Sequence, residues 1–336
     1  MHAGVTIKVC PGTLADGFST YSRACLNRVF NKRKVSHLLP YYPPQLNEGE
    51  PEKFRANRER LSISGLQEKY SLILDKNKLR LTEAGEKGTY ILKPIPAGLH
   101  LNHQIPANEH LTMQIASQVY KISTAPNAMI FYQNGEPAYI TKRFDVKEDL
   151  LKWGKEDFAS LAGKTKTTHG THYKYDGSYE ERGILLRKYV SAYLVEIEKL
   201  LALIVFNYLF SNGDAHIKNF ALLETMAGDY ILSPAYDLIN TRLHVDDQDF
   251  AMKKGLFEDN FQSAFMQKKG AAGLDDFLEL ARRFGIKEKR RDNLMTPFLQ
   301  SQPLVETLVN NSFLNTTTRQ LYLSLYEARR MKLNAR

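Results

Sequence analysis

The sequence has little cysteine: its 336 residues include only Cys10 and Cys25. Two cysteines can form at most one bridge, which excludes a disulfide-rich scaffold and a four-thiolate zinc site. Long apolar runs are also missing, since the longest, residues 200–206, is far shorter than the roughly 20 residues that cross a bilayer. The N-terminus lacks the basic region, apolar stretch and cleavage site of a secretory signal. We therefore expect two reduced thiols, no membrane segment and a cytoplasmic protein.

The overall composition is that of a globular protein. Hydrophobic residues make up 43% and charged residues 25%, which excludes wholesale disorder and low-complexity architecture. At roughly 150 residues per domain, the length favours two domains or one bilobal unit. Lys and Arg outnumber Asp and Glu by 46 to 37, a net charge of +9. This surplus favours anionic partners such as nucleotides, although most of it can equally be solvated surface.

The character of the chain changes twice along its length. Residues 41–51 contain paired prolines and indicate a linker, because paired prolines continue neither a helix nor a strand ladder. Short β-type runs follow up to about residue 144, and helical periodicity dominates beyond residue 150. The sequence thus predicts an α+β, bilobal fold with an N-terminal segment and linker (residues 1–55), a small β-rich lobe (56–146) and a larger helical lobe (147–336).

The β-rich lobe is predicted to hold five strands and one helix. The strands are expected at residues 70–74, 79–82, 89–93, 128–132 and 138–143. The helix is expected at 108–120, where Leu111, Ile115 and Val119 form the stripe of a helix laid on a sheet. In the helical lobe, a long apolar helix is predicted at 187–210 and amphipathic helices at 275–284 and 317–333.

The most informative stretch, residues 209–220, comes at the end of the long apolar helix. In it, Asp214 is followed five positions later by Asn219. Two short β-type runs, 220–223 and 230–232, then form a predicted hairpin, and Asp237 comes after it. Because the hairpin returns the chain, we expect the loop and the second aspartate to face one cleft.

This order of residues is what phosphoryl transfer from ATP requires, because the protein mainly supplies positioning and cations to the moving phosphoryl group. Asp214 would orient the attacking hydroxyl and accept its proton. Asn219 and Asp237 would hold Mg²⁺, which prefers oxygen ligands. Each of these residues alone is also common in turns, through side-chain bonds to the backbone. As a set, in this order, they indicate a kinase.

Lys93 and Glu109 supply a second feature of this kind. Lys93 ends a predicted strand, and Glu109 begins the helix of the same lobe. In protein kinases a strand lysine contacts the ATP phosphates and pairs with a helix glutamate. A Lys93–Glu109 pair is therefore possible, and the alternative is a strand-end lysine in solvent.

Residues 62–69, S-I-S-G-L-Q-E-K, precede the first predicted strand, where a phosphate-covering loop is expected. With a single glycine they do not match G-x-G-x-x-G. A serine close to the γ-phosphate could itself be phosphorylated, and the added charge would compete with the ATP phosphates for the same amides. Alternatively, Ser62 and Ser64 only hydrogen-bond within a hairpin.

Other motif-like stretches do not indicate a site. Gly163-Lys164-Thr165 resembles the end of a P-loop, but Phe158 stands where that motif needs a glycine. Two closely spaced histidine pairs lack a third zinc ligand. Gly213 stands where many eukaryotic kinases carry an arginine before the catalytic aspartate. An arginine at this position that grips a phosphorylated activation loop is therefore not available.

Taken together, these residues resemble the HipA family of bacterial serine/threonine kinase toxins, over about residues 61–240. Residues 62–69 look like the family's phosphate loop, 90–94 like its ATP-lysine strand and 142–145 like its hinge. Residues 212–220 resemble its catalytic loop, and Tyr236-Asp237 its metal-binding aspartate. The resemblance implies a protein-kinase-like, HipA-type fold with ATP and Mg²⁺ as cofactors.

HipA proteins carry an additional N-terminal subdomain before the phosphate loop, whereas here the loop begins at residue 62. That short N-terminus and the doubled serine look like the HipT kinases of three-component HipBST systems. The resemblance implies a growth-inhibiting toxin that phosphorylates an aminoacyl-tRNA synthetase and autophosphorylates on Ser62, Ser64 or both. It also implies a small HipS-like antitoxin and a HipB-like DNA-binding partner, through which contact with DNA would be indirect.

By motif position, the resemblance makes Asp214 the catalytic base and Asn219 and Asp237 the Mg²⁺ ligands. Contacts with ATP are implied for residues of the phosphate loop, the lysine strand, the hinge and the catalytic region: Ser62, Ile63, Ser64, Gly65, Lys69, Lys93, Lys142, Phe144, His216, Lys218 and Tyr236.

Two other functions fit parts of the pattern. A small-molecule or lipid kinase could use the same scaffold, although the doubled serine argues against it. A non-catalytic module could bridge a DNA-binding partner and a small antitoxin, but the presence of Asp214, Asn219 and Asp237 together would then be a coincidence.

Overall fold

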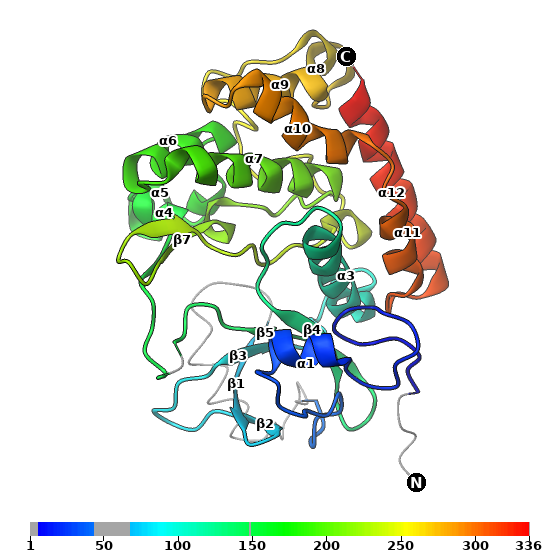
Figure 1. Cartoon of the computed structure of the whole chain (residues 1–336). Helices are drawn as coiled ribbons and strands as arrows, with labels where there is room; N and C mark the ends of the chain where they lie inside the picture. Colours follow the sequence, from blue (N-terminus) through cyan, green and yellow to red (C-terminus); the bar gives the residue numbers. More distant parts are fainter. Residues whose placement is uncertain (1–5, 44–67, 148, 336) are drawn as a thin grey trace. The chain divides into compact units, whose positions relative to one another are not determined.

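A computed structural model describes residues 6–43, 68–147 and 149–335 (Figure 1). The chain divides into two units. Unit 1 comprises Met1–Gln114, Ala125–Lys152 and Thr307–Arg319, and unit 2 comprises Ile115–Thr124, Trp153–Glu306 and Gln320–Arg336. Each unit is therefore built from segments that are distant in the sequence. The predicted boundary between residues 55 and 56 lies outside the described residues.

Unit 1 contains an antiparallel sheet with the strand order β2-β1-β3-β5-β4. Its strands are β1 (Tyr70–Asp75), β2 (Lys78–Leu81), β3 (Tyr90–Lys93), β4 (Asn127–Phe131) and β5 (Pro137–Lys142). The five strands predicted from the sequence are confirmed, and their ends differ from the prediction by no more than one residue. Runs of β-branched and aromatic residues between turn residues explain this agreement.

The two faces of this sheet carry different side chains. Leu92 of β3 belongs to a hydrophobic cluster with Cys25 and Val29 of α1 (Arg23–Val29; blue in Figure 1). Successive strand residues point to opposite faces. Lys93 therefore faces the other way, where it contacts Glu109 of α3 (Ile105–Gln118).

Unit 2 consists mainly of helices around α7 (Tyr193–Leu209), most of whose side chains are buried. Its other helices are α4 (Phe158–Leu161), α5 (Lys166–His169), α6 (Tyr179–Tyr189), α8 (Ala264–Lys269), α9 (Leu274–Arg283) and α10 (Glu288–Leu299). Three of the described helices have residues in both units: α3, α11 (Pro303–Asn310) and α12 (Thr316–Asn334). The helices predicted at 108–120, 275–284 and 317–333 are confirmed as α3, α9 and α12.

The single helix predicted at 187–210 is wrong, because two helices occupy this stretch. Residues 187–189 form the last turn of α6, and Val190 then has an extended backbone with φ −118° and ψ 117°. Helix α7 begins only at Tyr193. Leu186, Val190 and Ile197 are all buried. The apolar pattern therefore runs across the break and does not mark it.

A second antiparallel sheet, with the order β6-β7-β8, lies in unit 2. The predicted hairpin is confirmed as β7 (Ala221–Glu224) and β8 (Tyr230–Leu232). The sequence analysis missed β6 (Lys155–Asp157), because its three residues are all charged and show no β pattern. Across the described part of the chain, every helix is too short or too polar to span a bilayer.

Candidate active site

The loop that carries Asp214 is tied to buried structure at its start. After α7 ends at Leu209, Ser211 adopts a left-handed conformation with φ +52°. The Asn212 side chain donates from Nδ2 to Oδ1 of Asn207 at 2.8 Å and to the backbone carbonyl of Asp237 at 3.3 Å. This second bond joins the catalytic loop to the segment that carries the other predicted aspartate.

Gly213, directly before Asp214, lies against the chain segment 247–248. Its amide donates to Thr241 Oγ1 at 2.9 Å. A Cβ on Gly213 would lie only 2.7 Å from the backbone carbonyl oxygen of Gln248 and 2.5 Å from the side chain of Asp247. A backbone oxygen cannot turn aside as a side chain can. The close approach of this backbone therefore requires a glycine before the predicted base.

The Asp214 side chain is half exposed, and both of its partners among the described residues contact Oδ1. Tyr175 donates its hydroxyl at 2.8 Å, and Lys174 Nζ lies 3.9 Å away. Partial burial raises the pKa of Asp214, and Asp247 and Asp237 add to this effect, while Lys174 and Tyr175 oppose it. A raised pKa makes the carboxylate a better proton acceptor.

Asn219 and Asp237, the predicted Mg²⁺ ligands, lie in direct contact: Asn219 Nδ2 donates to Asp237 Oδ2 at 3.2 Å. Asn219 ends the 3₁₀ turn η3 (Ile217–Asn219). Asp237 has φ +55°, a left-handed conformation that few residues other than glycine, asparagine and aspartate adopt. The 3₁₀ turn η3 and the segment that follows β8 therefore place these two side chains in contact.

Asn219 Oδ1 is buried and has no hydrogen-bond partner among the described residues. A buried amide oxygen beside a carboxylate fits a hard divalent cation such as Mg²⁺, which takes oxygen ligands. Within the described ranges, no three His, Cys, Asp or Glu side chains gather as a metal site. A cation held by Asn219 and Asp237 would therefore take its other ligands from water and phosphate oxygens, as Mg²⁺ commonly does.

The other predicted ATP contacts of unit 2, His216, Lys218 and Tyr236, lie in the same two chain segments as this pair. His216 is buried, and its ring packs edge-on against Tyr175 with the centroids 5.5 Å apart. Burial, together with Lys174, lowers the pKa of His216 to about 3, so the imidazole is neutral at neutral pH. Tyr236 donates its hydroxyl to the carbonyl oxygen of Lys218 at 2.8 Å. This bond holds the catalytic loop against the segment that leads to Asp237.

Two side chains of α6 support the same loop. Tyr179 donates its hydroxyl to the carbonyl oxygen of Ala215 at 3.0 Å. The guanidinium of Arg182 lies 4.5 Å from the ring centroid of Tyr179 and 4.9 Å from that of Phe220, and Arg182 is completely buried. Sequence reasoning missed Arg182 because arginine is usually a surface residue.

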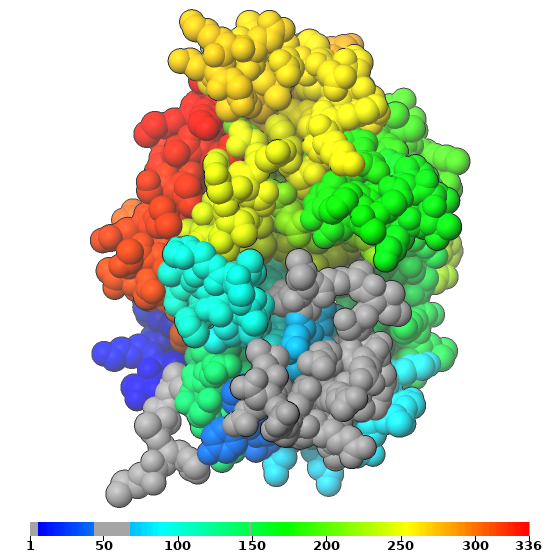
Figure 2. All heavy atoms as spheres, turned by 180° about the vertical axis from the view of Figure 1, so that it is seen from behind, coloured from blue at the N-terminus to red at the C-terminus, as the bar shows by residue number. Residues whose placement is uncertain are grey.

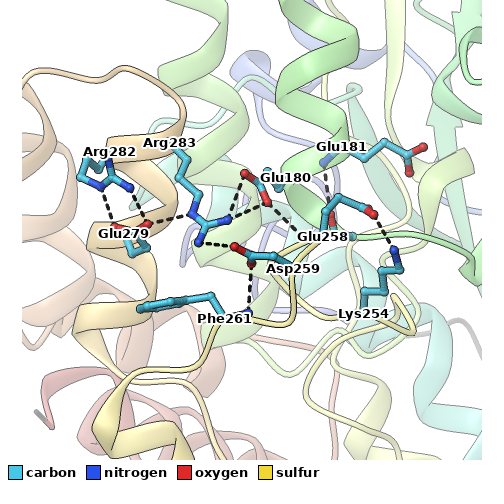
Figure 3. Close-up of polar contacts among 10 residues, drawn as sticks. Glu180, Glu181, Lys254, Glu258, Asp259, Phe261, Glu279, Arg282 and Arg283 are labelled. Carbon is cyan, nitrogen blue, oxygen red and sulfur yellow. Dashed lines mark hydrogen bonds and ion pairs between the residues drawn. The ribbon is translucent and has the colours of Figure 1, made fainter.

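The segment that follows the site, residues 254–261, is fixed by Arg283 of α9 (Figure 3). Arg283 contacts Glu279 at 2.8 Å, Asp259 at 3.0 Å and Glu180 at 3.2 Å. Glu180 also accepts the backbone amide of Glu258 at 3.0 Å. Helices α6 and α9 therefore both hold this segment through one arginine.

Backbone hydrogen bonds place residues 253–254, where this segment begins, beside the residues that contact Asp214. The amide of Lys253 donates to the Tyr175 carbonyl at 2.9 Å, and that of Lys254 donates to the Gly177 carbonyl at 3.2 Å. Figure 2 shows the two stretches, yellow and green, side by side on the surface. The position of Tyr175 is thus coupled to that of residues 253–254.

In unit 1, the predicted Lys93–Glu109 pair is confirmed. Lys93 Nζ lies 2.6 Å from Glu109 Oε1, and the two side chains are 6% and 3% exposed. The ammonium also lies 5.4 Å from the ring centroid of Tyr139 on β5. Because a buried charge without a partner is costly, the pair fixes both side chains.

The predicted hinge, residues 142–145, begins at Lys142, the last residue of β5. The Lys142 amide donates to the Pro126 carbonyl at 2.8 Å, and the Arg143 amide donates to the Thr89 carbonyl at 2.9 Å. Both amides are therefore used within unit 1, and adenine would have to contact other groups of the hinge. Lys142 Nζ donates to Asn31 Oδ1.

Phe144 and Lys69 are both half-buried, and Lys69 directly precedes β1. The other predicted phosphate-loop residues, Ser62, Ile63, Ser64 and Gly65, lie outside the described residues. Their contacts with ATP, and phosphorylation of Ser62 and Ser64, stay predictions.

Sequence reasoning missed Lys174 and Tyr175, which contact the Asp214 carboxylate. They lie in the 3₁₀ turn η2 (Tyr173–Tyr175), directly after His169 and His172, one of the two histidine pairs that lack a third zinc ligand. No spacing rule connects this turn with the catalytic loop. Only the tertiary fold brings them together.

Comparison with known proteins gives matches over most of the chain. The family described as HipA-like C-terminal domain matches residues 61–303. A Sinorhizobium fredii protein named "Putative kinase Y4mE" is 31% identical over 196 residues, which are 56% of this chain and 44% of that protein. This chain thus spans less than half the length of that relative. A Haemophilus influenzae protein named "Putative kinase" is 22% identical over 335 residues, 95% of this chain and 94% of that protein.

Two solved structures share the fold. The Shewanella oneidensis MR-1 toxin–antitoxin complex of HipA, HipB and operator DNA contains a chain that aligns with TM-score 0.62 and 19% identity, over 87% of this chain and 68% of that chain. The Helicobacter pylori proinflammatory kinase CtkA aligns with TM-score 0.51 and 14% identity, over 80% of this chain and 90% of that chain. The α+β, kinase-like fold predicted from the sequence is therefore confirmed.

Proposed function

Because the chain belongs to the HipA-like C-terminal domain family, we propose that it is a toxin-type protein serine/threonine kinase. It would transfer the γ-phosphate of ATP to a serine of a protein substrate. The observation that carries this proposal lies in unit 2, where the half-exposed Asp214 carboxylate shares one short loop with Asn219, and Asn219 contacts Asp237. Protein kinases use carboxylate and amide side chains of this kind to position the substrate hydroxyl and to hold divalent cations.

In this reaction Asp214 orients the substrate hydroxyl and takes its proton as the oxygen attacks phosphorus and ADP leaves. Tyr175 occupies Oδ1, so we assign the proton to Oδ2. Asn219 and Asp237 would hold Mg²⁺, which when bound offsets the negative charge of the phosphate oxygens. We assign phosphate contacts to neutral His216 in unit 2 and to Lys93 in unit 1.

The substrate and partners are proposed from the resemblance to HipA and HipT kinases. We propose that the substrate is an aminoacyl-tRNA synthetase, and that the chain also phosphorylates its own Ser62 or Ser64. The Shewanella complex contains HipB and operator DNA, which supports a HipB-like DNA-binding partner here. The HipS-like antitoxin is proposed from the doubled serine, Ser62 and Ser64, of the predicted phosphate loop.

The test uses purified full-length chain, dephosphorylated first, with Mg²⁺, γ-labelled ATP and purified aminoacyl-tRNA synthetases. We expect labelled phosphate on the chain and on one synthetase. Asp214→Asn should reduce incorporation by roughly 10²-fold or more, because it removes the base, while calorimetry should show retained Mg²⁺-ATP binding. The matched control is Asp229→Asn, the same change on an exposed carboxylate whose partner in the β7–β8 turn is Thr225.

Two results would contradict the proposal. If Asp214→Asn incorporates phosphate at the wild-type rate, Asp214 is not the base. If the dephosphorylated wild type neither binds Mg²⁺-ATP nor labels itself or any synthetase, the chain is not a protein kinase of this type.

A further inference from the structure

The two cysteines of the chain lie in one hydrophobic cluster of unit 1, and neither is assigned to catalysis. Cys10 is in the N-terminal segment and Cys25 is on α1; both are free thiols, and both are buried. Residues 6–22 contain no helix and, apart from an isolated bridge between Val9 and Asp16, no strand pairing. The pair therefore joins an irregular segment to the first helix.

Ser22 and Gly12 connect the two sulfur atoms. Cys10 Sγ accepts the backbone amides of Ser22 at 3.1 Å and Gly12 at 3.4 Å, and it lies 3.3 Å from Ser22 Oγ. Ser22 Oγ in turn accepts the amide of Cys25 at 3.2 Å. A Cβ on Gly12 would lie only 2.0 Å from Cys25 Sγ, so both sulfur atoms flank the same glycine.

These donors favour a thiolate on Cys10. The hydrogen bond from Cys25, followed by those from Ser22, outweighs burial and lowers the pKa of Cys10. The same contact with Cys10, together with burial, raises the pKa of Cys25. The two thiols therefore differ as an attacking and a resolving cysteine differ: the amide donors around Cys10 favour its thiolate, and Cys25 keeps its proton.

We propose that Cys10 and Cys25 form a redox-active pair that hydrogen peroxide converts into a reversible disulfide. The Cys10 thiolate attacks one oxygen of hydrogen peroxide, the O–O bond breaks, and Cys10 becomes a sulfenic acid, while the leaving hydroxide takes a proton from solvent and becomes water. The Cys25 sulfur then attacks the Cys10 sulfur, an S–S bond forms as the S–O bond breaks, and the hydroxyl group leaves as a second water with the proton of Cys25. Two thiols and one peroxide thus give one disulfide and two waters, and a dithiol reductant reverses the change.

Burial of both sulfur atoms means that peroxide reaches them when residues 8–17 open locally, as irregular segments do more readily than helices and strands. The resulting disulfide would fasten the N-terminal segment to α1. The proposal is independent of the kinase assignment, because neither cysteine is part of the proposed active site.

The test uses the reduced full-length protein, exposed to hydrogen peroxide, denatured, and treated with a maleimide. We expect the wild type to lose both maleimide-reactive thiols and two hydrogen atoms of mass, and dithiothreitol to restore both. Peptide mapping should show a linkage between Cys10 and Cys25. In Cys25→Ser, Cys10 should stop at sulfenic acid, which dimedone captures, because no resolving thiol is present.

Cys10→Ser keeps Cys25 but removes the thiolate, so its reaction with peroxide should be slower by on the order of 10-fold or more. Matching circular dichroism spectra would show that both variants fold. The proposal is wrong if the wild type keeps two reactive thiols under peroxide that oxidises free dithiothreitol, or if it forms only links between chains. It is also wrong if Cys25 in Cys10→Ser reacts as fast as Cys10 does in the wild type.

Discussion

At the scale of single residues, the acidity of Asp214 depends on two neighbours that no kinase motif includes. Tyr175 donates to the carboxylate oxygen that Lys174 also approaches, and both favour the charged form. Burial, with the Asp214 carboxylate beside it, raises the pKa of Tyr175, so the phenol stays protonated and remains a donor. These contacts influence the pKa of Asp214 and therefore the pH range in which it can accept a proton.

Replacing Tyr175 by phenylalanine removes that donor and should raise the pKa of Asp214 further. Only the ionised carboxylate can accept a proton, so the variant should lose activity at a higher pH than the wild type when the solution is acidified. The pH dependence of phosphate incorporation measures this shift. Tyr173→Phe is the matched control, because Tyr173 contacts Lys218 through its ring, with 6.0 Å between the ammonium and the centroid. Coinciding acidic limbs in all three proteins would refute a role for the Tyr175 hydroxyl.

Gly213→Ala should disturb the loop at the residue before the base. The new methyl group would meet the Gln248 carbonyl oxygen, at 2.7 Å from an ideal Cβ, and overpacking of this kind costs about 1–3 kcal/mol. We expect lower phosphate incorporation and a lower unfolding temperature. Adding Asp247→Ala removes the side-chain clash but leaves the carbonyl, so the double variant should not recover. If the double variant recovered full activity and stability, the Asp247 side chain, and not the Gln248 carbonyl oxygen, would be what requires the glycine.

At the scale of helices and strands, the sequence predicted those features that depend on order along the chain. The strands of unit 1, the β7–β8 hairpin, the Lys93–Glu109 pair and the Asn219–Asp237 contact all follow from local patterns and from the order of elements. The break between α6 and α7 did not, because buried apolar residues continue across it. The contacts that α6 and η2 make with the catalytic loop arise from packing between distant segments, which no local pattern encodes.

The ion cluster around Arg283 connects two helices with residues 254–261, and its loss should destabilise the protein. Arg283, Glu180 and Glu279 are each less than one-fifth exposed. Arg283→Met would leave these carboxylates without their shared partner, which should lower the free energy of unfolding by on the order of 2 kcal/mol. Thermal or urea unfolding measures this change.

Arg282→Met is the matched control, since Arg282 is the preceding residue, is 70% exposed and, within the described part of the chain, forms its ion pair with Glu279 alone. An exposed pair of this kind contributes up to about 0.5 kcal/mol. Equal losses in the two variants would mean that the three-carboxylate contact of Arg283 adds nothing beyond a surface ion pair.

At the scale of the whole molecule, buried histidines make stability depend on pH. His110 in unit 1 and His216 in unit 2 are both buried, and burial lowers the pKa of each to about 3 from an ordinary value of 6.5. The unfolded chain therefore binds these protons at a higher pH than the folded chain does. The contribution of the two buried, neutral histidines to the free energy of unfolding is fully present above pH 6.5, the ordinary pKa of histidine. It is lost as the pH falls from there toward 3. Each histidine should lower the free energy of unfolding by about 2 kcal/mol on going to roughly pH 5.

Urea unfolding at neutral pH and at about pH 5 tests this expectation. His110→Gln removes one titrating group, so the variant should lose less stability on acidification than the wild type, whatever its stability at neutral pH. His169→Gln, on an exposed histidine, should match the wild type. If acid destabilises wild type and His110→Gln equally, His110 does not bind its proton differently in the folded and unfolded chains.

The ion cluster around Arg283 has a consequence for control of the protein. Many kinases order the segment after the metal-binding aspartate only when a phosphate group, added after translation, attracts an arginine. Here Glu180, Asp259 and Glu279 supply the negative charges from the polypeptide itself. Residues 254–261 are then in place as soon as synthesis and folding end, and a phosphatase has nothing there to remove. The order of this segment therefore does not depend on an added phosphate group.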